Sequence, residues 1–336
     1  MIETITGEGS FDANVRDAIN RNFRAISGGL LSVGTVFFLN ASSPAAADSN
    51  SGLSSGAGFR TLAAAYAALT AGKNDVLVIV GDGATTGTVR SEAAFTWAKN
   101  STHLFGVGSP GLYSQRARIA PTGSTTAFTP FFTISGSGCV FQNIQWFHGF
   151  DTGVVTALGV VVTGSRNVFQ NCHIAGMGDA ASAQSAGSRS LKIGSGGSGE
   201  NLFLDCVIGI DTVTRTQANA SVEFAGATAR NVFRRCHFPF MTSAAGVLGI
   251  LGTGNGCVDR HNSFEGCSFI NAIKSTSTGM TALLSFTTAS PGGMIIFKDC
   301  AMVGVTKFGD TNGLANSYVD MAAVSASAGG LMVNPS

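Results

Sequence analysis

The sequence predicts an all-β protein: a right-handed parallel β-helix, that is, a single-stranded solenoid, with an N-terminal arm and helix and a capping helix. Three observations lead to this prediction. A short phrase returns six times, apolar residues alternate with other residues around each copy, and Gly, Ser and Asn separate the copies. Short strands stacked coil upon coil account for all three.

The repeated phrase is Phe-x-x-Cys, with Ile in place of Cys in the first copy. The copies occupy residues 141–144, 169–172, 203–206, 233–236, 264–267 and 297–300. Their spacing of about 30 residues is typical of a solenoid. An apolar residue stands two positions after each copy: Trp146, Ile174, Ile208, Phe238, Phe269 and Met302. This alternation has the two-residue period of a strand and not the period of helical repeats.

Each repeat also contains a predicted bend. A second strand is predicted upstream of the phrase, at residues 159–162, 191–193, 222–224, 248–250 and 283–286. The residue before Cys or Ile is Asn143, Asn171, Asp205, Arg235, Gly266 or Asp299. Because Asn and Asp tolerate the left-handed backbone of a tight bend, we predict a corner there. Phe then points inward before the corner, and Cys points inward after it.

Neighbouring coils place opposite charges side by side. The residue after Phe is Arg234, Glu265 and Lys298 on three consecutive copies. On the other strand, Lys192 would face Glu223. Equivalent residues on adjacent coils lie about 4.8 Å apart, so this alternation favours outward ladders of ion pairs.

The phrase Asn-Val-Phe-x-Asn-Cys-x-Ile at residues 167–174 and the apolar run at 75–80, followed by Gly-Asp-Gly, point to a known fold. They resemble the right-handed, pectate-lyase-like β-helix. The resemblance covers residues 75–336 and implies a fold without specifying a function. Polysaccharide lyases and hydrolases share this fold, so their catalytic residues are the first to look for.

Glycoside hydrolysis requires two carboxylates within about 5 to 10 Å of each other. The acids on the predicted ladders are Asp205, Glu223, Glu265 and Asp299. Asp205 and Asp299 lie three coils apart, about 14 Å by strand spacing, and the two Glu residues lie beside Lys or Arg. We therefore predict no catalytic residues and no enzymatic activity. One alternative stays open, the convergence of the loop acids Asp151, Asp179, Asp211 and Asp310.

Other ligand chemistry has little support in the sequence. His173 and His237 share one ladder position, but Val207 lies between them. The two imidazoles are therefore too far apart to bind one metal ion. We predict no metal site and no cofactor. The chain has 2 Trp and 3 Tyr against 24 Phe, few rings for a sugar-binding cleft.

The composition limits which binding partners and which cellular compartment we expect. The net charge of +1 offers no electrostatic footprint for nucleic acid, and the 12% of charged residues is about half the usual share. No apolar run reaches the roughly 20 residues of a membrane span. Five of the seven Cys occupy one ladder position, where we predict small, buried, unbridged side chains. The chain opens without the features of a signal peptide, which predicts synthesis in a reducing host cytoplasm.

Residues 1–30 form the first predicted unit, an arm followed by a short helix at 11–26. One stripe of this helix is apolar: Phe11, Val15, Ile19, Phe23 and Ile26. Such a short helix needs a surface against which to bury its stripe, so we predict that it attaches the protein to a partner. Alternatively, the helix packs on the flank of the solenoid or bundles a trimer. The Ser-Gly-Gly at 27–29 would separate it from the rest of the chain.

Residues 31–336 form the second predicted unit, the β-helix domain. A strand at 35–39 and a loop precede a capping helix at 59–71, which covers the first coil beginning at 75–80. Residues 330–333 are predicted to form a last, incomplete strand with no second lid. The loops at 176–188, 209–219, 271–280 and 304–315 vary most, which favours a role in recognition.

Phage virion proteins place a short attachment segment before a β-helix that assembles as a trimer, and this chain is similar. The resemblance implies a structural virion protein. We expect a homotrimeric capsid decoration protein, of the cement or head-fibre kind, that binds the major capsid protein or another virion protein through its N-terminal segment. The alternatives are a tailspike or tail fibre that binds or cleaves host surface polysaccharide, and a host-surface adhesin. Host surface glycans are a further expected ligand of the variable loops.

Overall fold

The computed structural model describes residues 34–320, with gaps at 85, 109–110, 112, 115–116, 123–128, 150–157, 195–197, 243 and 273–279. The predicted attachment helix at 11–26 and the predicted strand at 330–333 lie outside the described residues.

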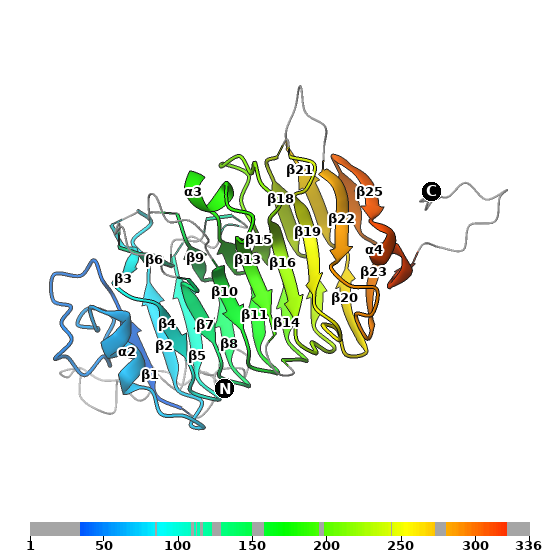
Figure 1. Ribbon diagram of the computed structural model, residues 1–336. Helices are drawn as coiled ribbons and strands as arrows, with labels where there is room; N and C mark the ends of the chain where they lie inside the picture. Colours follow the sequence, from blue (N-terminus) through cyan, green and yellow to red (C-terminus); the bar gives the residue numbers. More distant parts are fainter. Residues whose placement is uncertain are drawn as a thin grey trace.

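The described chain is a parallel β-solenoid with three sheets of ten, eight and eight strands (Figure 1). Sheet A consists of β1 (Val36–Leu39), β2 (Val76–Val80), β5 (His103–Val107), β8 (Val140–Gln142), β11 (Val168–Gln170), β14 (Leu202–Leu204), β17 (Val232–Arg234), β20 (His261–Glu265), β23 (Met294–Lys298) and β26 (Ser317–Asp320). Sheet B consists of β3 (Val89–Ser91), β6 (Arg118–Pro121), β9 (Gln145–Phe147), β12 (His173–Ala175), β15 (Val207–Ile208), β18 (His237–Phe240), β21 (Ser268–Asn271) and β24 (Ala301–Val303). Sheet C consists of β4 (Phe95–Trp97), β7 (Phe132–Ile134), β10 (Leu158–Val162), β13 (Arg189–Ile193), β16 (Ala220–Ala225), β19 (Leu248–Thr253), β22 (Met280–Phe286) and β25 (Val305–Gly309).

The predicted Phe and Cys ladders are confirmed. Phe169, Phe203, Phe233 and Phe264 pair in register and are buried, and their successive ring centroids lie 4.4, 4.5 and 4.6 Å apart. All seven Cys are free thiols. On five coils the thiol donates to the carbonyl of the Phe on the preceding coil, at 3.3 to 3.4 Å. Cys thus binds adjacent coils together without a covalent link.

The predicted corner is also confirmed. All six residues before Cys or Ile have φ between 49° and 61°. Two of the predicted ion pairs form as well: Arg234 lies 2.8 Å from Glu265, and Lys192 lies 2.9 Å from Glu223. The third, between Glu265 and Lys298, is absent among the described residues. Register between coils therefore follows directly from the recurring residues.

A buried ladder of Asn side chains joins sheet C to sheet A, and the sequence analysis missed it. Its members open the repeated phrase on four coils: Asn167, Asn201, Asn231 and Asn262. The Oδ1 of Asn231 accepts from the backbone N–H and the Nδ2 of Asn201, at 3.1 and 2.9 Å. Asn262 does the same for Asn231, at 3.0 and 2.9 Å. Each amide thereby satisfies a buried backbone donor that the turn leaves without a strand partner.

Both ends of the stack differ in detail from prediction. The capping helix α2 spans only Leu62–Ala68, because Thr61 caps it and Phe59 instead forms a parallel bridge with Leu39. The first coil begins at β1 and not at 75–80, since Val36 pairs in parallel with Val76. Helix α2 lies at the β1 end, where Leu62 and Ala65 are buried (Figure 1).

The other end carries a short helix that was not predicted. Residues 304–315, expected to be a variable loop, form β25 and then α4 (Thr311–Ala315). Val305 pairs with Met280 of β22, and the carboxylate of Asp310 caps α4 by accepting from Gly313 N at 2.7 Å. Helix α4 packs on β22 and β25, so this end is partly covered (Figure 1). The predicted loop at 176–188 likewise contains a helix, α3 (Ala180–Ala183).

His148 is a buried side chain without hydrogen bonds in the described part of the chain. It has no exposed surface, and its ring stacks on Phe131 with centroids 5.5 Å apart. Neither ring nitrogen has a hydrogen-bond partner among the described residues. Burial lowers the pKa of His148 to about 4, although the charge of Asp179 acts in the opposite direction. This imidazole is therefore neutral at pH 7.

Replacing Asn231 by Ala should lower the free energy of unfolding by about 1 to 3 kcal/mol, because the buried backbone N–H of Asn201 loses its acceptor. Chemical denaturation at pH 7 measures the loss. The matched control is Asn255→Ala at an exposed turn, which should cost less than about 0.5 kcal/mol. Equal costs at the two positions would contradict a stabilising role for the Asn ladder.

Acid should destabilise the fold through His148. The unfolded imidazole binds a proton below about pH 6.5, whereas the folded one resists protonation until about pH 4. The stability that the neutral His148 contributes is therefore fully present above pH 6.5 and is lost as the pH falls toward 4. His148→Phe keeps the stacked ring and should reduce this loss by about 3 kcal/mol. Denaturation series from pH 8 to pH 4 test it, and identical slopes in both proteins would refute it.

Candidate functional site

The outward face of sheet B carries one row of polar side chains. The register places Arg118, Gln145, His173, Val207 and His237 on successive strands of this row. The first three are almost fully buried although they point away from the core. Loops from other parts of the chain lie over them and form a pocket.

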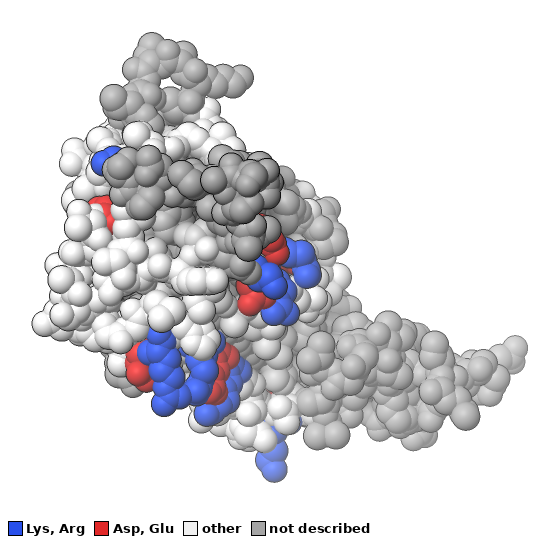
Figure 2. Space-filling view, turned by 90° about the vertical axis from the view of Figure 1, so that its right-hand side faces the viewer, with Lys and Arg blue, Asp and Glu red and all other residues white. Residues whose placement is uncertain are grey.

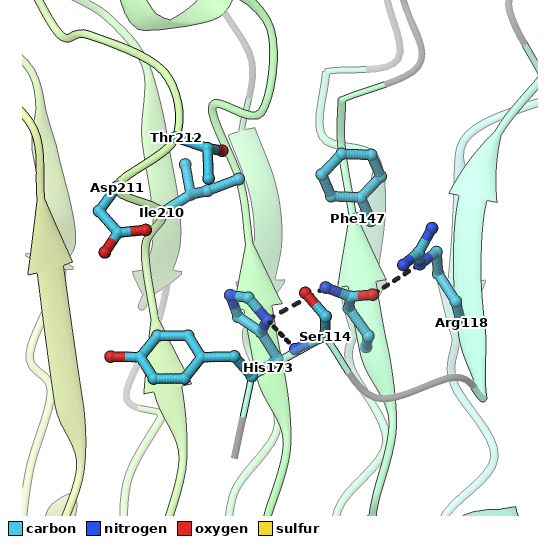
Figure 3. A pocket seen from close by; sticks show the side chains of 9 residues that line it. Ser114, Arg118, Phe147, His173, Ile210, Asp211 and Thr212 are labelled. Carbon is cyan, nitrogen blue, oxygen red and sulfur yellow. Dashed lines mark hydrogen bonds between the residues drawn. The ribbon is translucent and has the colours of Figure 1, made fainter. Parts of the chain in front are cut away.

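The pocket has a volume of about 480 Å³ and joins segments far apart in the sequence (Figure 3). Its floor comes from three strands of sheet B: β6, β9 and β12. One wall, called here the Tyr113 wall, consists of Tyr113 and Ser114. The opposite wall, the Asp211 wall, consists of residues 210–212 after β15. The remaining lining residues, which form the floor, are Arg118, Gln145, Phe147 and His173.

A continuous hydrogen-bond chain crosses the floor. Arg118 Nε donates to Gln145 Oε1 at 2.6 Å, and the guanidinium also lies over the Phe147 ring at 5.2 Å. Gln145 Nε2 lies 3.0 Å from His173 Nδ1, and His173 Nε2 lies 3.0 Å from the Gly209 carbonyl. Because a carbonyl oxygen only accepts, the proton of the neutral imidazole is on Nε2 and Nδ1 is the acceptor. Nδ1 also accepts from the backbone N–H of Ser114 at 3.1 Å.

Electrostatics keep this chain neutral at His173. Burial lowers the pKa of His173 to about 4; the Gly209 carbonyl acts in the opposite direction, and the charge of Arg118 lowers the pKa further. Burial and the nearby Asp211 carboxylate raise the pKa of the Tyr113 hydroxyl. With hydrogen bonds at both nitrogens, His173 is suited to holding structure and not to moving protons.

Three of the four acids on the ladders are ion-paired, and the fourth, Asp299, lies exposed at the corner before Cys300. Asp205 pairs with Arg235 at 2.7 Å, Glu223 with Arg189 at 2.8 Å, and Glu265 with Arg234. Of the four loop acids, Asp179 and Asp310 cap helices, and Asp151 lies outside the described residues. Asp211 is therefore the one acid among the described lining residues of the pocket. This geometry suits binding better than two-carboxylate hydrolysis.

Two groups of the pocket are available to a ligand. The half-buried Asp211 carboxylate has no hydrogen bond or ion pair within the described part of the chain. Tyr113 is 39% exposed and packs edge-on against His173 and His237, with centroids 6.1 and 5.4 Å away. The sequence analysis named Asp211 and both His residues but missed Tyr113 and Arg118. A polar residue repeated at the outward position of three coils was the available signal.

The remaining surface offers few other sites. On the face seen in Figure 2, Lys and Arg lie beside Asp and Glu in small groups, and most of the surface is uncharged. Among the residues that the structure describes, no three His, Cys, Asp or Glu side chains gather as metal ligands. None of the helices there has the length and apolar character needed to cross a bilayer. The predicted partner-binding stripe lies outside the described residues: Phe11, Val15, Ile19, Phe23 and Ile26.

The chain is similar to solved structures of enzymes and, at a lower TM-score, to that of a viral protein. No protein-family model matches the sequence, and no similar curated protein is found. The pectate lyase Pel9A superposes with a TM-score of 0.54 and 16% identity, over 82% of this chain and 64% of that chain. A pectin methylesterase in complex with a hexasaccharide gives 0.51 and 18%, over 86% and 91%. The ORF18 protein of Geobacillus virus E2 gives 0.46 and 13%, over 89% and 54%. The chain thus shares the parallel β-helix fold of the pectate lyase and the pectin methylesterase.

Proposed function

We propose that this chain is a structural protein of a phage virion: a homotrimeric, non-enzymatic capsid decoration protein held to the capsid by residues 1–30. The observation that carries the proposal is the use of the acids. Asp205, Glu223 and Glu265 are ion-paired along the solenoid, so they are not free for glycan cleavage. The amphipathic stripe from Phe11 to Ile26 supplies a surface for attachment to the major capsid protein or another virion protein.

Such a protein acts by burying surface. Binding to the assembled shell and not to its dissociated subunits stabilises the shell by mass action. Three identical copies match a local threefold axis, where one attachment helix can reach each neighbouring subunit. A stack of coils whose register is set by Phe, Cys and Asn ladders provides a rigid body for this bridging.

Deleting residues 1–30 should abolish capsid binding and leave the coils intact, because helix α2 already covers the first coil and the Ser-Gly-Gly at 27–29 is predicted to separate the segment from it. The test is co-sedimentation with particles that lack the protein, with light scattering to confirm a folded trimer. Ile19→Asp should reproduce the deletion, and Arg21→Ala, on the opposite face of the predicted helix, is the matched control. Wild-type occupancy by the truncated protein would move the contact to the coils, and a stable monomer would refute the trimer.

The pocket on sheet B favours a second candidate, recognition of host surface glycans by a tailspike or tail-fibre protein. A free carboxylate accepts charge-assisted hydrogen bonds from pairs of sugar hydroxyls. The exposed face of Tyr113 offers apolar contact beside it. The coexistence of Asp211 and Tyr113 at a concave site is the observation that carries this candidate.

Asp211→Asn and Tyr113→Ala should each weaken saccharide binding about tenfold, a loss of about 1.4 kcal/mol. The measurement is binding to an array of capsule and lipopolysaccharide fragments, with Asp299→Asn at an exposed corner as control. No new oligosaccharides should be released. Binding that is indifferent to both substitutions would exclude the pocket, and product release lost in Asp211→Asn would favour a glycan-cleaving tailspike.

A further inference from the structure

We propose that His173 is a positioning residue that ties both walls of the sheet B pocket to its floor, and that protonation of this imidazole releases the Tyr113 wall. The structural part of the proposal concerns the protein without any ligand. Its consequence for binding rests on the second candidate function, recognition of a saccharide at this pocket.

The ring is hydrogen-bonded to all three parts of the pocket. Nδ1 accepts from Ser114 N of the Tyr113 wall at 3.1 Å, and from Gln145 Nε2 of the floor at 3.0 Å. Nε2 donates to the Gly209 carbonyl, immediately before the Asp211 wall, at 3.0 Å. Ser114 lies 59 residues and Gly209 lies 36 residues from His173 in the sequence. One side chain therefore fixes two loops that local sequence does not hold together.

Protonation removes the acceptor that Ser114 and Gln145 share. An imidazolium carries N–H groups on both nitrogens, so Nδ1 would face the donors of Ser114 and Gln145 with a donor of its own, while Nε2 still donates to Gly209. Rotating the Gln145 amide would give the ring an acceptor. The same rotation takes Oε1 away from Arg118 Nε, from which it now accepts at 2.6 Å. In either orientation of Gln145, the N–H of Ser114 has lost its acceptor and faces another donor, and moving the Tyr113 wall away relieves this.

The charged and titratable groups around the ring set the pH at which this happens. Arg118 on β6 opposes a second positive charge, and Asp211 favours it. Tyr113 packs on the ring edge-on, and its other neighbour His237 lies beyond Val207 on β18. Burial dominates these effects and holds the pKa of His173 at about 4. The Tyr113 wall is therefore held at neutral pH and released as the pH falls toward 4, whereas the Nε2–H bond to Gly209 is kept at both pH values.

Hydrogen exchange on the full-length protein tests the proposal without a ligand. Peptides that contain Ser114 should be protected at pH 7 and lose at least tenfold protection at pH 4, after correction for intrinsic exchange rates, whereas peptides that contain residues 209–212 should be protected at both pH values. In His173→Gln, whose side chain can accept and donate but does not titrate, the Ser114 peptide should stay protected at both pH values. In His173→Phe it should be unprotected at both, while a core peptide around Phe203 reports that the coils remain folded. The matched control is His261→Gln on β20 of sheet A, away from the pocket, and it should behave like the wild type.

The outcomes separate the two proposals. Wall peptides that are equally protected in His173→Phe and in the wild type, or a loss at pH 4 that persists in His173→Gln, would overturn the role of His173. If the exchange results hold and a saccharide from the array binds the wild type at least tenfold more weakly at pH 4 but not His173→Gln, the regulatory part holds too. If the exchange results hold and no saccharide binds at pH 7, the second candidate function fails while the positioning role stands.

Discussion

Each coil of this solenoid can satisfy its backbone N–H and C=O groups only through the coils before and after it. That requirement governs where the chain bends and which residues bend it. A single residue with φ near 50° turns sheet A into sheet B, and the amide of Asn231 replaces a missing strand partner where sheet C turns into sheet A. A coil that bent one residue early would turn Phe233 to the outside. It would also leave the groups that form both sets of hydrogen bonds without partners. The recurring residues therefore fix the height of every coil as well as its shape.

The sequence was most informative where one residue determines one position. Phe inward, Cys inward and the corner between them follow from a two-residue period and a recurring bend, and the ion pairs follow from coil spacing. The Asn ladder was not predicted because Asn also occurs in surface turns. The residue type alone therefore does not identify a buried amide that hydrogen-bonds to the backbone. Helix α4 was not predicted because Asp310 was considered as a possible catalytic acid and not as a helix cap.

The candidate site could be predicted only in part, for a physical reason. His173 and His237 were placed correctly on one row, since that depends on register alone. The pocket depends on Tyr113, which reaches over His237 from a segment more than 100 residues away in the sequence. Nothing in local periodicity encodes where such a segment lies. The same contrast explains part of the chemistry: register pairs Asp205, Glu223 and Glu265 with Arg side chains, whereas Asp211, placed by a loop, has no ion pair among the described residues.

Because of the stacked thiols, refolding of this protein depends on the redox conditions that it meets while it is unfolded. In the folded protein every Cys except Cys300 is buried, and the stacked thiols join adjacent coils without being oxidised. A molecule that opens in aerated buffer presents seven reactive sulfurs on one chain, and random cross-links then compete with re-stacking. Recovery after unfolding should consequently depend on the redox state of the buffer more than on temperature. For coils held together by non-covalent ladders, reducing conditions during folding act as part of the folding information.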